Sequence, residues 1–212
     1  MATKIEIVNG ALTMFGHRRL TSLTAENDTA RAVAAVYDQS VLEMLEAPPD
    51  WSFARKHSGA LALLSEVDLD TGIQPVQGWD YLYAIPSNCV KVRKVFEDGG
   101  AHLSPQDRAD KQNFEEIVHP TSAVTCIATD IEDAYSWFTA KITDPTQFSP
   151  SFVAALKAKL AMELVLPLTQ KETLFASMER RFLGAISEGI RINTTRDNPK
   201  KTESCGYIDA RG

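Results

Sequence analysis

The hydrophobic pattern of this chain changes twice, and these changes limit the folds that it can adopt. Apolar residues recur at helical spacing before position 46 and again after position 150, whereas short β-favouring runs lie between. Segregated helical and β segments are typical of α+β proteins. We therefore expect a helical bundle from the N- and C-terminal helices, an inserted small antiparallel β domain and an extended C-terminal tail.

Local signals predict where the helices begin and end. Thr3 can cap a first helix that ends at Gly16, and a second helix starts at residue 28 or 29 and stops at the proline pair 48–49. Two more helices follow position 150, the first ended or kinked at Pro167. The expected apolar stripes are Ile5, Val8, Leu12 and Phe15; Ala30, Val33, Ala34, Tyr37, Val41, Leu42 and Leu45; Phe152, Ala155, Leu156, Leu160 and Leu164; and Leu174, Met178, Phe182, Ala185 and Ile186.

The central region predicts five short strands, at 81–85, 89–96, 114–118, 124–128 and 135–142. The stretch 51–64 is ambiguous, because the alanines and leucines of 60–64 favour a helix by propensity while Gly59 indicates a break. The expected division is a helical part at 1–78, the β domain at 79–148, helices completing the bundle at 149–192 and the tail at 193–212.

Charge and cysteine content disfavour several classes of protein. The 212 residues carry a net charge of −6, which argues against a broad electrostatic grip on DNA or anionic lipid. Three cysteines without a CxxC pair predict free thiols in a reducing compartment rather than a disulfide framework. We recognise no secretion signal and no membrane-spanning run.

The sequence has no phosphate-loop, nucleophile-elbow or zinc-protease motif. Glu66, Asp68 and Asp70 alternate as in a calcium loop, but the glycine that such a loop requires is one place late, so we expect a solvated loop. The acidic cluster at 130–133 is interpreted as a solvated turn. His57 or His119 could still form a dyad with a serine or cysteine, since dyads assemble in space. We expect no cofactor and no metal.

Aromatic and basic residues are the remaining candidates for binding. Tyr135 and Trp137 share one face of the last expected strand, and the opposite face is apolar as well, so one face is expected to contact another subunit. The basic pair at 18–19 is interpreted as part of a solvated loop.

Several short blocks, in order, resemble the tail tubular protein A family, the head-to-tail adaptors of short-tailed phages. They include IVNGAL at 7–12 and YAIPSNCVKV at 83–92, in which Asn88 stands where the family pattern has aspartate. Further blocks are 20–23, 29–31, 37–42, 51–54, 142–145, 148–152 and 154–161. Each block is short, and the resemblance rests on their order and spacing over almost the whole chain.

The resemblance implies a non-enzymatic virion protein at the head–tail junction, made in the host cytoplasm. Twelve copies would form a ring that joins the portal protein to the tail nozzle protein, with tail fibres as possible further partners. DNA would pass through the channel without sequence-specific binding, and no membrane is involved. We expect the tail to bind the portal or a neighbouring subunit through Arg196, Lys200, Lys201, Tyr207 and Ile208, and Tyr135 and Trp137 to contact a subunit or the nozzle.

Three other interpretations stay open. A different phage connector, such as a stopper or tail-completion protein, has the same general role. A small hydrolase would use His57 or His119. An independent DNA-binding protein is disfavoured by the net charge of −6.

Overall fold

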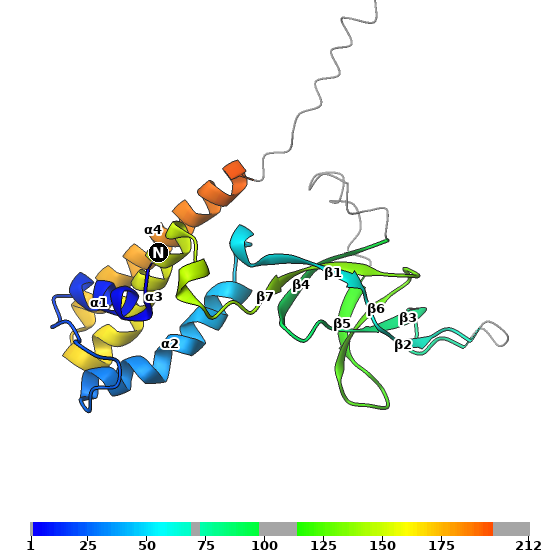
Figure 1. The fold of residues 1–212 in the computed structure, drawn as a ribbon, viewed down its shortest axis with the longest axis horizontal. Coiled ribbons are helices and arrows are strands. Elements are labelled where there is room, and N and C mark those ends of the chain that lie inside the picture. The colour runs from blue at the N-terminus through cyan, green and yellow to red at the C-terminus, as the bar shows by residue number, and fades with distance from the viewer. Residues whose placement is uncertain (1, 69–72, 98–113, 197–212) are drawn as a thin grey trace, which may run out of the picture.

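The computed structural model describes residues 2–68, 73–97 and 114–196 of the 212-residue chain. Over these residues the protein has four α-helices and two antiparallel β-sheets, which confirms a mixed α+β class. Figure 1 shows an elongated molecule with the helices at one end and the sheets at the other.

The first two helices begin and end where the local signals predict. Helix α1 (Lys4–Met14) has a capping box, in which Thr3 Oγ1 accepts from the Glu6 amide and Glu6 accepts from the Thr3 amide. Gly16 follows it with a φ of 75°, a conformation that glycine adopts without steric cost. Helix α2 (Asp28–Glu46) is capped by Asn27 and ends just before the proline pair at 48–49.

One position of the expected α2 stripe is wrong. Ala34 is exposed, whereas Ser40, which the apolar pattern left out, is buried. The Ser40 hydroxyl donates to Glu163 Oε2 at 2.5 Å, and Lys159 Nζ lies 2.9 Å from both Glu163 and Glu43. A polar network therefore joins α2 to α3.

Helices α3 (Pro150–Thr169) and α4 (Glu172–Arg196) follow the sheets. Ser149 caps α3, and Pro167 lies inside its last turn rather than ending it. Helix α3 contacts α1, α2 and α4, so it is the central helix of the group. Helix α4 continues to Arg196, four residues into the expected tail that begins at 193, because Asn193 is buried and the helix remains packed there.

The first sheet has the order β1-β7-β4, formed by Arg55–Ala60, Tyr135–Ala140 and Cys89–Phe96. The second has the order β2-β3-β6-β5, formed by Leu63–Glu66, Tyr81–Ala84, Thr125–Thr129 and Phe114–Val118. The strands expected between 81 and 142 are therefore confirmed, each to within two residues at either end.

The ambiguous stretch 51–64 forms strands, and the helical propensity of 60–64 is not realised. After a short 3-10 turn (Ser52–Ala54), the chain forms β1 and β2, which pair with β7 and β3. Alanine and leucine favour helices in isolation, but long-range backbone pairing overrides this weak preference. The sheets thus begin at Arg55, inside the range 1–78 that the sequence analysis assigned to the helical part.

One large hydrophobic core connects the helices to the first sheet. It contains buried side chains from α1, α2 and α3, Met178 of α4, Trp51, and Phe138 and Ala140 of β7. A second cluster lies between the two sheets and includes Val92, Val95 and Ile127. A third, with Leu82, Cys126 and Ala128, lies on the other face of the second sheet.

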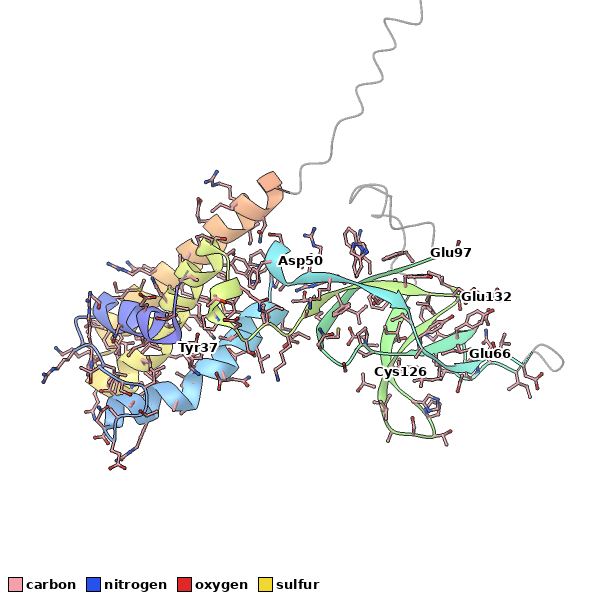
Figure 2. The ribbon with its side chains drawn as sticks, in the orientation of Figure 1. Tyr37, Asp50, Glu66, Glu97, Cys126 and Glu132 are labelled. Atoms are coloured by element: carbon pink, nitrogen blue, oxygen red, sulfur yellow. The ribbon has the colours of Figure 1, made fainter. Side chains whose placement is uncertain are left out.

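A polar junction fixes the first sheet to the end of α2. Arg93 donates to the carbonyl oxygens of Leu45 and Glu46 at 3.2 and 3.4 Å, and Asp50 lies 3.2 Å from Arg55 and 3.7 Å from Arg93. The last carbonyls of a helix have no partner within the helix and carry partial negative charge, so a cation is favourable there. Figure 2 shows Asp50 at this junction.

Candidate functional site

The two aromatic residues that the sequence singled out lie on β7, the middle strand of the first sheet. Tyr135 and Trp137 are half-buried, while Ser136 and Phe138 between and beside them are buried. The predicted alternation is therefore present. Thr139, on the same face as Trp137, is nonetheless fully buried, because the Arg93 guanidinium covers it and donates to its hydroxyl at 2.8 Å.

The neighbouring strands extend this face. His57 of β1 pairs with Trp137, and Phe96 of β4 pairs with Tyr135, and paired residues share a face. The ring centroids of Trp137 and His57 are 4.4 Å apart, and Phe96 lies 6.3 Å from both Tyr135 and Trp137. The Trp137 indole donates to Nδ1 of His57. We call this surface, with its residues His57, Phe96, Tyr135 and Trp137, the aromatic face.

Four basic residues belong to the same side of the sheet. Arg55 and Lys91 pair with Thr139, Lys94 pairs with Trp137, and Arg93 donates to the Thr139 hydroxyl. Lys91 is exposed, and the Arg55 guanidinium carbon is 5.6 Å from the Trp137 ring centroid. Strands β1, β4 and β7 contain no aspartate or glutamate. The aromatic face is therefore also cationic, although Asp50 offsets part of the charge of the two arginines.

The end of the sheet region farthest from the helices has the opposite charge. The stretch 61–90 contains four acidic residues and the stretch 114–134 contains five, and neither contains lysine or arginine. Figure 2 shows Glu66, Glu97 and Glu132 at this end. Burial raises the pKa of Tyr81 above its ordinary value of 10, and the charges of Glu132, Asp80, Glu66 and Asp133 raise it further. We call these four carboxylates the acidic tip.

His119 has a serine partner, but the hydrogen bonds run in the wrong direction for a catalytic dyad. Its Nδ1 accepts from the amides of Thr121 and Ser122, both at 3.2 Å. The proton of the neutral ring is therefore on Nε2, which lies 3.1 Å from Ser65 Oγ and donates to it. A general base needs a free lone pair facing the serine hydroxyl. This geometry does not favour the hydrolase interpretation.

The two cysteines in the described part of the chain are also poor nucleophiles. Burial raises the pKa of the Cys89 thiol to about 11, and the nearby charge of Glu116 adds to the effect. Cys126 is fully buried, and this burial raises the pKa of its thiol as well. Because the thiolate is the reactive form, both groups are largely unreactive at neutral pH.

The acidic loops do not gather into a metal site in the described residues, where no group of three or more His, Cys, Asp or Glu side chains could hold an ion. Asp130 accepts from the Asp80 amide, and the turn from 130 to 133 connects β6 to β7 with all of its carboxylates exposed. Asp70 of the calcium-like pattern lies outside the described residues.

A second group of basic residues lies at the helical end of the molecule, in the loop between α1 and α2. His17, Arg18 and Arg19 line a pocket of about 280 Å³ beside the start of α2. The half-buried Asn9 side chain holds this loop through two hydrogen bonds to the backbone of Leu20, at 2.7 and 2.9 Å. The basic pair therefore lies on an ordered loop, with both arginines exposed.

The expected tail anchors are Arg196, at the end of α4, and four residues that follow it in the sequence. Helix α4 ends at Arg196, and nothing is described of that side chain. Lys200, Lys201, Tyr207 and Ile208 lie outside the described residues. Sequence alternation identified Tyr135 and Trp137, but it missed His57, Phe96 and the basic residues, because the strand register that brings them together is not local information.

Comparison with known proteins adds no family. No protein-family model matches the chain, and no curated protein matches it in sequence. Among the described helices, none is long and apolar enough to cross a membrane.

Proposed function

We propose that this chain is a non-enzymatic structural adaptor of a phage virion, twelve copies of which form a ring joining the portal to the tail nozzle around the DNA channel. The observation that carries the proposal is the aromatic and cationic outer face of the sheet β1-β7-β4. The opposite face of this sheet packs on the main core through Phe138 and Ala140, so the sheet is a rigid platform for contact with other chains. Aromatic residues and arginine are enriched at protein interfaces.

The order of elements fits an adaptor subunit. Helices α1 and α2 precede the sheets and α3 and α4 follow them, so the β region is an insertion in a helical body. In the proposed arrangement the helical bundle faces the portal and the β domain faces the nozzle. The tail from 193, of which the first four residues are helical, docks on the portal or on a neighbouring copy through Arg196, Lys200, Lys201, Tyr207 and Ile208.

The chemistry of the described residues favours this role over an enzymatic one. His119 donates toward Ser65, and the Cys89 thiol keeps its proton at neutral pH. A stopper or tail-completion protein is the nearest alternative, and the copy number in the ring separates the two. The net charge of −6 suits a channel wall that DNA passes without binding tightly.

Electron microscopy of the chain mixed with the portal ring of its own phage tests the proposal. We expect a second ring of density with twelvefold symmetry beneath the portal. A variant that ends at residue 192 should fold and fail to attach, since it lacks the tail. Portal particles without added density in the presence of the full chain would refute the adaptor role. Normal attachment of the shortened variant would refute only the assignment of the tail.

A further inference from the structure

We propose that the aromatic face of one copy binds the acidic tip of the next copy, which makes a head-to-tail contact between identical chains. The inference rests on the proposed ring and identifies the two surfaces that would build it. Its basis is the separation of charge within the sheet region, where the basic residues lie on one sheet and the acidic residues lie at the far end.

The aromatic face is basic as well as apolar. It combines exposed or half-buried rings with Arg55, Lys91 and Lys94, in strands that contain no carboxylate. Asp50 offsets part of the charge of the two arginines that hold the junction with α2, where its side chain is 34% exposed. The complementary surface for such a face is acidic and partly apolar.

The acidic tip has both properties. Glu66 pairs with Tyr81 across β2 and β3, and Asp80 precedes Tyr81 in the chain. The Asp80 amide donates to Asp130, in the turn that also carries Glu132 and Asp133, so the four carboxylates are neighbours. Leu63 and Leu64 on β2, the strand that also carries Glu66, are 47% and 42% exposed. The acidic tip is therefore complementary to the aromatic face: its carboxylates can pair with the lysines, and its exposed leucines can pack on the rings.

The two surfaces can be used at the same time by one molecule. The other side of β7 packs on the main core through Phe138 and Ala140, so the aromatic face is on the outer side of this sheet. Glu66 and Glu132 lie at the end of the sheets away from the helices (Figure 2). A contact between two different surfaces is heterologous, and repeated heterologous contacts generate a ring when the rotation closes.

A pair of charge-reversed variants tests the contact. K91E/K94E makes the aromatic face acidic, and E66K/D80K/E132K makes the tip basic, because Asp133 is then the one carboxylate left of its four. Each variant alone should associate at least about tenfold more weakly than the wild type, because both of its surfaces then carry the same sign. An equimolar mixture should recover association, since every contact in an alternating assembly again joins opposite charges. Sedimentation velocity measures all three states.

The matched control is K56E/K171E, which changes the net charge by the same amount as K91E/K94E. Lys56 is exposed but pairs with Phe138, so it is on the other side of β1, and Lys171 lies between α3 and α4. This variant should associate as the wild type does. Wild-type association should also weaken when NaCl rises from about 0.05 to about 0.5 M, because salt screens exposed charges.

Three results would overturn the inference: unchanged association of the reversed variants, failure of their mixture to recover, or a wild type that is monomeric at every salt concentration. Salt-sensitive binding of a labelled single-stranded oligonucleotide that K91E/K94E loses would assign the face to nucleic acid instead. Twelve copies on the portal together with any of these results would leave the adaptor role intact and refute only this contact.

Discussion

The two sheets share antiparallel pairing but differ in charge and in what supports them. The sheet β1-β7-β4 has basic strands, and Phe138 and Ala140 join it to the core of the helices. The sheet β2-β3-β6-β5 has Glu66, Glu115 and Glu116 and no basic residue, and it is supported by smaller clusters of its own.

The difference suggests a division of roles. A sheet anchored in the largest core holds its outer face rigidly, as a specific contact requires. A sheet held by small clusters at the end of the molecule tolerates more movement and can adjust to a partner. If this division holds, the two sheets should differ in what their core residues, charges and thiols contribute.

Removing the anchor should have the largest effect. Phe138→Ala should lower the free energy of unfolding by about 3–5 kcal/mol, because it opens a cavity where β7 meets the helices. Leu82→Ala, in the three-residue cluster of the second sheet, should cost less, about 2–3 kcal/mol. Urea denaturation of both variants measures the difference. A larger loss for Leu82→Ala would contradict the contrast in support.

The polar junction should contribute less than the core. Arg93→Met should lower the free energy of unfolding by about 1–3 kcal/mol, since the last carbonyls of α2 and the Thr139 hydroxyl lose their donor. Lys91→Met on the same strand is the control and should stay within about 0.5 kcal/mol of the wild type, because Lys91 is exposed. Equal losses for the two variants in thermal or urea unfolding would argue against the junction.

The Cys89 thiol, at the start of β4, should react slowly because it is partly buried. In a Cys205→Ser background, Cys89 should react with a disulfide reagent at pH 8 about 100-fold more slowly than an ordinary thiol, because a pKa of about 11 leaves little thiolate. Its contribution to folding should be present below pH 9 and be lost as the pH rises toward 11, because the folded-state pKa is the higher one. Fast labelling of Cys89 in the folded protein would show that the strand opens readily.

The smallest effect concerns the charge of the acidic tip. Glu132→Gln should lower the pKa of Tyr81, because it removes the largest of the charges that raise this pKa. The raised pKa means that the stabilising contribution of Tyr81 is present below pH 10 and is lost as the pH rises beyond it. Ultraviolet titration, with Tyr81→Phe to identify the signal, measures the change, and Lys91→Met is the control that should leave it unchanged.

Local signals explain why much of the fold could be predicted. Thr3, Gly16 and the prolines at 48–49 act through their own backbone chemistry, so the helix ends are predictable from neighbouring residues. The run 60–64 could not be assigned in this way, because its strands exist only through pairing with β7 and β3. Ser40 was missed for a similar reason, since its partner Glu163 is 123 positions away.

The candidate surface was only half predictable. Alternation along β7 placed Tyr135 and Trp137 together, since a strand has a period of two. The register of β4 shifts between Val92 and Lys94, and that of β1 shifts between His57 and Ala60. These irregularities decide which basic and aromatic side chains join Trp137, and no sequence rule available at the outset specifies them.

The native mass of the chain, alone and mixed with its portal ring, tests the proposed ring. Twelve copies of the 23.4 kDa chain have a mass of about 281 kDa. We expect this mass as a free ring or as mass added to the portal. A chain that stays at 23.4 kDa and adds nothing to the portal would contradict it.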